Sequence, residues 1–278
     1  MGQWTCRTIF LENRGMAEDT GPRNVARITT VSDIQSVDLN ADVGEECGQD
    51  AALMRCITSA NVACGVHAGS LVTMRETIAL AREHGVAVGA HPSFPDREQF
   101  GRREMQLESV EIAELVIRQI EALAAVASNE GIRLMHVKPH GALYNVAVRD
   151  RRVADAIAGA VASIDRSLIL VGLPRSELVA AGRAAGLHTA GEAFADRAYR
   201  ADGTLVPRSE PGAVIHDPEQ VLARVSGLAA RPDVETICVH GDTPGAAELA
   251  SKIRAALEAA KFEVKHLSSP RFRDERTS

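Results

Sequence analysis

The sequence predicts one α/β domain in which seven or eight strand–helix units close into a (β/α) barrel. Short apolar runs alternate with stretches of helical periodicity, and strand-then-helix repetition implies parallel strands joined by crossover helices. The length of 278 residues suits a barrel, because α/β barrels commonly fill about 200–250 residues as one domain. In addition, polar side chains gather where the expected strands end, which is where barrels of this kind build their sites.

The pattern begins at Val37, and each strand run is short, rich in aliphatic residues and bounded by turn residues. The expected strands, in order, are VDLNA, SANVAC, VAVGAH, RLMHVKP, SLILVG, LHTAGE, TICVHG and FEVKHL. Apolar residues repeating at helical spacing predict helices over residues 73–84, 109–128, 152–163, 176–185, 218–228 and 246–260. We expect residues 35–270 to form a single catalytic barrel domain, and residues 1–34, which show no sustained period, to be a disordered or artefactual N-terminal extension.

Two connections are longer than the others, residues 91–107 and 193–217. Long excursions from strand ends usually serve as lids or partner surfaces. The second connection contains ADGT between Tyr199 and Val206, which predicts a hairpin turn.

Composition favours a small polar ligand over a polymer. The net charge is -6 with scattered basic residues, which gives no footprint for nucleic acid. One Trp, two Tyr and six Phe are too few for extensive stacking platforms. No apolar run approaches the roughly 18 residues of a membrane span, and no signal peptide is evident. We expect a cytoplasmic protein with no nucleic-acid or membrane partner.

The five cysteines are expected to be reduced thiols. Their number is odd and no pair has CxxC spacing, which in a chain of this size favours a cytosolic protein without a disulfide framework. Cys64 and Cys238 lie inside apolar runs and are expected to be small buried hydrophobic residues.

Polar residues near the strand ends recur at every second position. Asp38, Asn40 and Asp42 alternate with apolar residues, so an extended chain places all three on one face. Local turn and helix-capping chemistry could account for each polar residue separately, but the opposite helix-to-strand turns, NEGIR and AAGLH, carry ordinary polar or small residues. We therefore expect one cavity at the carboxyl rim. Five histidines lie at or just past a strand end: His67, His91, His136, His140 and His240.

Common catalytic signatures are missing from the sequence. It contains no P-loop, dinucleotide fingerprint, HExxH motif or nucleophile elbow. The segment HGDTPGA could present a helix N-terminus to an anion, which is a weak indication of phosphate binding.

Seven motifs in unbroken order resemble the LamB/YcsF family, over about residues 37–264. That family is the A subunit of prokaryotic 5-oxoprolinase. Two departures are Ala41, where Cys or Ser is common, and Ser70, where Asp is usual. The motifs are DLNADVGE, SANVACGVHAG, GAHPSFPD, FGRREM, HVKPHGALYN, FADRAYRADGTLVPRSEPGAVIHD and ICVHGDTPGA.

The resemblance implies a barrel of the glycoside hydrolase/deacetylase type. It also implies ATP-dependent opening of 5-oxo-L-proline (pyroglutamate) to L-glutamate, with ATP and its Mg²⁺ as cofactor and with two partner subunits, B and C. Twelve residues carry the family pattern here. The candidate catalytic residues are Asp38, Asp42, His67, His91, Lys138, His140 and His240, and the candidate substrate-binding residues are Asn40, Glu45, Asp196, Arg197 and Asp242.

One hypothetical route begins with phosphorylation of the amide oxygen, followed by attack of water. Lys138 would stabilise the developing negative charge, and Asp38, Asp42 or His140 would take a proton from water. Arg197 would pair with the substrate carboxylate.

Two other hypotheses remain open at this point. The chain could be a metal-dependent deacetylase in which Asp42, His67 and His91 hold Zn²⁺ and activate water, although sugar-stacking aromatics are scarce. It could instead be a non-catalytic subunit that binds the lactam while its partners carry the chemistry, which the missing ATP loop favours.

Overall fold

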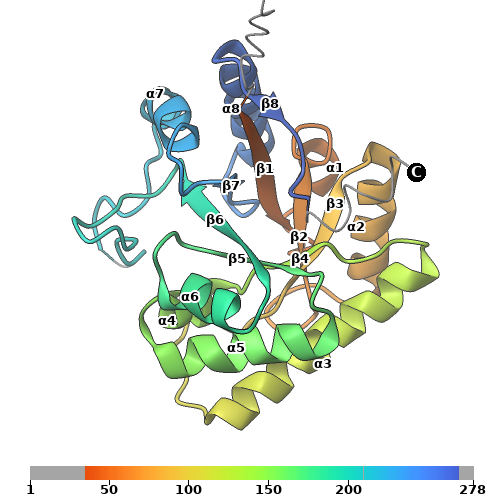
Figure 1. The fold of residues 1–278 in the computed structure, drawn as a ribbon. Helices are drawn as coiled ribbons and strands as arrows, with labels where there is room; N and C mark the ends of the chain where they lie inside the picture. Colours follow the sequence, from red (N-terminus) through yellow and green to blue (C-terminus); the bar gives the residue numbers. More distant parts are fainter. Residues whose placement is uncertain (1–34, 209, 269–278) are drawn as a thin grey trace, which may run out of the picture. The chain divides into compact units, whose positions relative to one another are not determined.

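Seven parallel strands close into a barrel in the computed structural model, which describes residues 35–208 and 210–268. The strand order is β2-β3-β4-β5-β6-β7-β1-β8, and β1 also pairs with β2, which closes the ring (Figure 1). The eighth strand lies outside the ring and pairs only with the start of β1. The predicted barrel is therefore confirmed. The strands are β1 (Ser36–Val43), β2 (Ser59–Ala63), β3 (Ala87–His91), β4 (His136–Val137), β5 (Ile169–Gly172), β6 (His188–Phe194), β7 (Thr236–Val239) and β8 (Glu263–Val264).

Helices follow most of the strands and surround the barrel (Figure 1). Six of them match the predicted ranges within a few residues. Apolar periodicity does not predict α1 or α4, because α1 spans only one turn and α4 begins directly after the polar HVKPH segment. The helices are α1 (Asp50–Leu53), α2 (Leu71–His84), α3 (Ser109–Asn129), α4 (Gly141–Arg149), α5 (Arg151–Ile164), α6 (Glu177–Ala184), α7 (Pro218–Ala229) and α8 (Ala246–Ala259).

Helix boundaries follow capping chemistry. The Ser70 hydroxyl accepts a hydrogen bond from the Thr73 amide at the start of α2, and Gly85 ends that helix in the left-handed conformation, which glycine adopts without a Cβ penalty. Asp217 caps α7 and is followed by proline at its first turn, where the missing amide costs nothing. These local signals explain why the predicted ends lie close to the observed ones.

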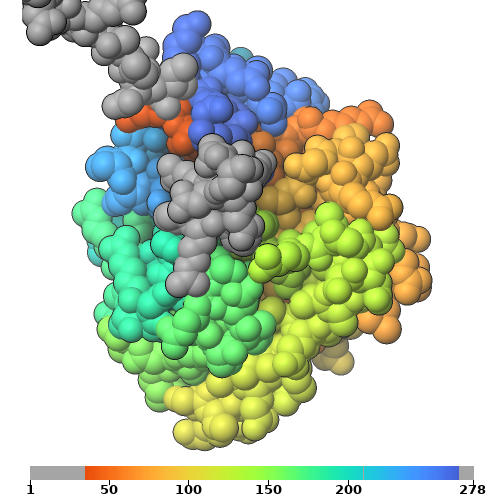
Figure 2. Space-filling view, turned by 45° about the vertical axis from the view of Figure 1, so that its right-hand side comes forward, coloured from red at the N-terminus to blue at the C-terminus, as the bar shows by residue number. Residues whose placement is uncertain are grey.

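The apolar core lies between the strands and the helices, and not inside the barrel. Val37, Leu39 and Ala41 point outward from β1 and are fully or almost fully buried under the helices. The alternate residues of β1 point into the barrel, whose interior is polar and hydrogen-bonded. On one side, α3 packs against α5 and α5 packs against α6, and Figure 2 shows this side as a continuous yellow-green to green surface.

The connection after β6 forms the predicted hairpin. Antiparallel bridges join Arg197 to Val214 and Tyr199 to Leu205, and the Arg200 amide donates to the Thr204 carbonyl across the turn at 2.8 Å.

No helix in the described part of the chain combines the length and the apolar character needed to cross a bilayer. Four thiols among these residues are free, those of Cys47, Cys56, Cys64 and Cys238. The expected extension at residues 1–34 lies outside the described residues, as does Cys6.

Candidate active site

The inward-facing residues of β1 form three levels within the barrel. Asp38 lies at the amino end, where its carboxylate accepts hydrogen bonds from the hydroxyls of Thr58, Ser59 and Thr236. Asp42 lies at the carboxyl end, about 13 Å further along an extended strand. The structure therefore does not bring Asp38, an expected catalytic residue, to the cavity; it belongs to the polar filling at the opposite end of the barrel.

Asn40 and Asn61 fill the middle level. The Asn40 amide donates to Glu192 and to Thr236, and the Asn61 amide donates to Asn40 Oδ1 at 2.7 Å and to Asp42 Oδ1 at 2.9 Å. Both side chains are thus committed to protein partners. Asn40, an expected substrate-binding residue, supports Asp42 and Lys138 from below.

His136 also lies in the interior, below the rim. Its Nε2 faces Asn61 Oδ1 at 2.8 Å, and burial lowers its pKa to about 3. A Cβ on Gly89 of the neighbouring strand would come within 2.2 Å of the His136 ring. Glycine at that position is therefore required to make room for the imidazole.

The Lys138 ammonium is the centre of a buried ion network. Its Nζ lies 2.9 Å from Asp42 Oδ1, 2.7 Å from Glu192 Oε1 and 3.0 Å from Cys238 Sγ. Burial opposes its charge, but Asp42, Cys238 and Glu192 outweigh that effect and raise the Lys138 pKa well above its usual value. Likewise, His91 and Lys138 outweigh burial and hold the pKa of Asp42 well below its usual range. Lys138 is therefore a fixed cation.

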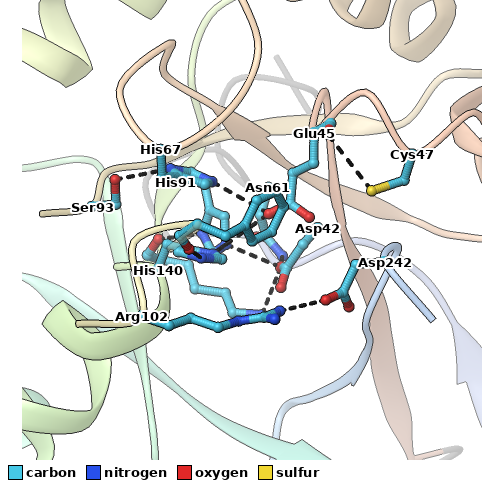
Figure 3. A network of polar contacts seen from close by, with 12 residues as sticks. Asp42, Glu45, Cys47, Asn61, His67, His91, Ser93, Arg102, His140 and Asp242 are labelled. Carbon is cyan, nitrogen blue, oxygen red and sulfur yellow. Dashed lines mark hydrogen bonds and ion pairs between the residues drawn. The ribbon is translucent and has the colours of Figure 1, made fainter. Parts of the chain in front are cut away.

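His91 at the end of β3 and His140 just after the neighbouring β4 lie side by side at the carboxyl end of the barrel (Figure 3). His91 Nδ1 lies 2.7 Å from the Lys138 carbonyl, and His140 Nε2 lies 2.8 Å from the Phe100 carbonyl. Because carbonyls only accept, both of these ring nitrogens carry hydrogen. The other two nitrogens, His91 Nε2 and His140 Nδ1, are 2.9 Å apart. With both rings neutral, two lone pairs would meet, so a proton or another cation is required between them.

The backbone around His140 supports this arrangement. Phe100 adopts a left-handed φ of 57°, a conformation that costs energy in residues other than glycine and often marks functional sites. Its carbonyl is thereby directed at His140. The long connection after β3 thus orients a rim histidine.

Glu45 and His67 form a second contact beside this pair. His67 Nε2 lies 3.3 Å from Glu45 Oε1, and His67 Nδ1 lies 2.9 Å from the Ser93 hydroxyl. Burial, followed by repulsion from Asp42 and Asp242, raises the pKa of Glu45 well above its usual value. Burial, followed by the charge of His91, lowers the pKa of His67 to about 3. Both shifts oppose a charged Glu45–His67 ion pair.

Four buried side chains offer ligand atoms within 4.8 Å of one another: Asp42, Glu45, His91 and His140. Two imidazoles with two carboxylates suit a divalent transition metal. The ring nitrogen of each histidine that would not bind the metal donates its N–H to a backbone carbonyl, as metal-bound histidines usually do. The chemistry of the donors thus fits a metal. His67, which the sequence suggested as a ligand beside Asp42 and His91, is not a member of this group.

A second group, Asp42, Cys238 and His240, has similar spacing. The Lys138 ammonium already contacts both Asp42 and Cys238, so a cation is in place there. Cys238 is buried as expected, but its sulfur contacts a charged amine and does more than fill space.

His240 and Asp196 form a hydrogen-bonded pair at 2.9 Å between Nδ1 and Oδ2. Burial opposes ionisation of Asp196, but His240 outweighs it and lowers the Asp196 pKa below its usual value. The ring of Phe194 stacks on His240 with centroids 5.4 Å apart. Asp196 thus orients the His240 ring through Nδ1 and leaves Nε2 of His240 for the cavity. Asp196, an expected substrate-binding residue, does not itself line the cavity.

A cavity of about 360 Å³ opens over these groups, within the usual size range of ligand pockets. Its walls include Asp42, His91, Lys138, His140 and His240. Glu45 and His67 are not among the residues that line it, and Arg102 of its wall pairs with Asp242 (Figure 3).

Sequence reasoning overlooked Glu192 and Asn61. Each is a polar residue at an inward-facing position of an otherwise apolar strand, Glu192 in AGEAF and Asn61 in SANVAC. A buried charge without a local partner in the sequence is the signal that could have identified Glu192.

Comparisons with known proteins agree with the fold. The fold is a (β/α) barrel similar to that of the catalytic domain of a peptidoglycan N-acetylglucosamine deacetylase from Eubacterium rectale. The two chains are 14% identical over 84% of this chain and 89% of the other, with a TM-score of 0.50. A putative cellobiose-phosphate cleavage protein from Enterococcus faecalis is similar at 14% identity, over 84% of this chain and 97% of that one, with a TM-score of 0.51. At these identities the likeness concerns the fold alone.

The family follows from two closer matches. The family model for LamB/YcsF matches residues 37–272, so the chain belongs to the LamB/YcsF family. A lactam utilization protein from Thermus thermophilus is 45% identical over 84% of this chain and 100% of that one, with a TM-score of 0.77. The resemblance inferred from the motifs is thus confirmed.

Proposed function

We propose that this chain is the lactam-opening subunit of an ATP-dependent 5-oxoprolinase, converting 5-oxo-L-proline to L-glutamate together with partner subunits B and C. The observation that carries the proposal is the fixed Lys138 cation beside the oriented His240–Asp196 pair, with Lys138 and His240 lining one cavity. Lactam hydrolysis needs stabilisation of negative charge on the amide oxygen and a base for water, and these groups could supply both.

His240 is the best-placed base. Its Nδ1–H donates to Asp196, which fixes the tautomer and leaves Nε2 able to take a proton from water. A histidine oriented by a buried carboxylate is a recurring arrangement for this role. Loss of general-base catalysis typically costs about 10²–10⁴-fold in rate.

Lys138 would act through its charge. Its donors already point at Asp42, Glu192 and Cys238, and the thiol is the weakest of these acceptors. A substrate oxygen could therefore replace Cys238 as a partner of the ammonium. A preorganised donor of this kind contributes about 3 kcal/mol to transition-state stabilisation.

A metal at Asp42, Glu45, His91 and His140 would polarise a carbonyl oxygen or lower the pKa of bound water. The protein groups prepare for such an ion by holding both histidine tautomers through backbone carbonyls. This group also favours a second candidate function, a metal-dependent deacetylase-like hydrolase. Metal analysis of protein purified without chelators, combined with acetyl-release assays, separates the two functions.

The ATP and partner requirements rest on family membership. The sequence contains no P-loop, so we assign no phosphate-binding residues. For the partners, the exposed apolar residues Leu71, Val72 and Val110 lie in the first turns of α2 and α3, the helices that follow strands β2 and β3. Leu71 and Val72 are adjacent in the sequence, and we propose this first turn of α2 as a contact for a partner subunit.

The decisive test is reconstitution. Glutamate release and ATP hydrolysis are measured for this chain alone, for the B and C subunits together, and for all three. We expect 5-oxoproline-dependent ATP hydrolysis and glutamate release only with all three, and their loss in the His240→Gln variant at unchanged assembly. Full turnover by subunits B and C without this chain would refute the proposal.

A further inference from the structure

Four basic side chains of lysine and arginine line the cavity: Arg102, Lys138, Arg197 and Arg208. Three of them have protein partners. Lys138 pairs with Asp42 and Glu192, and Arg102 pairs with Asp242.

The third, Arg197, is held by the hairpin that follows β6. Its Nε donates to the Ala213 carbonyl at 3.1 Å and its Nη2 to the Val206 carbonyl at 2.6 Å. The sequence predicted Arg197 as the carboxylate ligand, but two of its five guanidinium N–H groups donate to carbonyls of the hairpin. Arg197 is therefore a positioning residue for the segment that leads to Arg208.

Arg208 differs from the other three. It is half-buried and lines the cavity next to Pro207, and among the described residues no hydrogen bond or ion pair to its guanidinium is found. The nearby carboxylate of Asp196 binds His240 through Oδ2 and leaves Oδ1 without a hydrogen bond; its charge interacts with Arg208, but the two side chains form no ion pair. A guanidinium kept partly out of water with no acceptor in hydrogen-bond contact is unfavourable, and a second guanidinium close by adds repulsion.

The pKa of Arg197 reflects this excess of positive charge. Burial and then the proximity of Arg208 lower the pKa of Arg197 to about 10. An anion entering the cavity at this point would relieve the repulsion and complete the hydrogen bonding of Arg208.

We infer that Arg208 binds the carboxylate of the substrate and makes the cavity select lactams that carry a carboxylate over neutral ones. The inference rests on the proposed function for the identity of the ring. The carboxylate at Arg208 would leave the amide of the same small ligand toward Lys138 and His240, which line the same cavity. A guanidinium can bind a carboxylate through two parallel hydrogen bonds, which gives orientation as well as affinity.

The test compares two rings that differ only in the carboxylate, 5-oxo-L-proline and 2-pyrrolidinone. Equilibrium binding of each to the full chain is measured by calorimetry or ligand-observed NMR for the native protein, Arg208→Gln and Arg208→Lys. The control is Arg200→Gln, because Arg200 lies on the same hairpin but pairs with Glu210 at the surface. L-Glutamate and acetate serve as carboxylates without a lactam ring.

We expect the native chain to prefer 5-oxo-L-proline over 2-pyrrolidinone by about tenfold or more, as charged hydrogen bonds of this type allow. Arg208→Gln should remove that preference and leave 2-pyrrolidinone binding within about twofold, Arg208→Lys should keep part of it, and Arg200→Gln should match the native chain. An unchanged preference in Arg208→Gln, or no carboxylate binding at all, overturns the inference. If acyclic carboxylates bind through Arg208 but neither lactam binds, the proposed function fails and the carboxylate site stands.

Discussion

Replacement of Glu192 by Gln tests the ion network that holds Lys138. The change keeps the size of the side chain and removes one of the two carboxylates that contact the ammonium, at 2.7 Å. Both groups are almost fully buried, and removing one partner of a buried pair typically costs about 3–5 kcal/mol. We therefore expect Glu192→Gln to lower the free energy of unfolding by about 3 kcal/mol, at the lower end of that range, since Asp42 still neutralises Lys138 at 2.9 Å.

Replacement of Lys138 by Met should cost about 3–5 kcal/mol, because it leaves two carboxylates buried together. The double variant should cost clearly less than the sum of the single ones, since residues in one network are not additive. Urea unfolding followed by circular dichroism measures all three. For a barrel of this size, each 1 kcal/mol corresponds to about 2–4 °C in Tm.

The matched control is Glu248→Gln. Glu248 contacts Lys252 at the same 2.7 Å, but both side chains are exposed, so the change should stay within about 0.5 kcal/mol. Single-variant losses in the network below about 1 kcal/mol, or additive losses, would refute the reasoning.

Three further predictions follow from the same structure. Protein purified without chelators should carry a divalent metal that His140→Ala loses and His67→Ala keeps, as elemental analysis would show; equal loss in both would contradict the assignment. Gly89→Ala should yield unfolded or insoluble protein, because the new methyl group would lie 2.2 Å from the imidazole ring of His136. The control Gly159→Ala, in open space on α5, should be neutral or stabilising by up to about 1 kcal/mol. Normal folding of Gly89→Ala would contradict this packing of the barrel interior. Burial raises the pKa of Asp38 despite its hydroxyl partners, so the folded state binds the proton more tightly than the unfolded state. The free energy of unfolding should therefore fall as pH rises from about 4 through that raised pKa. Denaturation of Asp38→Asn at a series of pH values should lack this fall, and a pH profile equal to that of the native protein would contradict the prediction.

The strand register explains which site residues could be predicted. Alternation in DLNAD shows that Asp38, Asn40 and Asp42 share a face, and the structure agrees with that parity. Parity alone does not say which end of the barrel a residue reaches. Asp38 pairs in register with Thr236 at the start of β7, whereas Asp42 is the last residue but one of β1 and pairs with Asn61 of β2, and of the three only Asp42 lines the cavity.

The local sequence by itself determined the order of the strands and of six of the eight helices, the motifs that define the family, and the polar rim, because each depends on residues close together in the sequence. Tertiary structure alone decided which polar groups touch. Closure of the barrel brings Glu192 and Cys238 to Lys138 and sets His140, rather than His67, against His91 with Asp42. Lys138 and Cys238 are 100 positions apart, and no short-range pattern encodes the height and rotation at which distant strands meet.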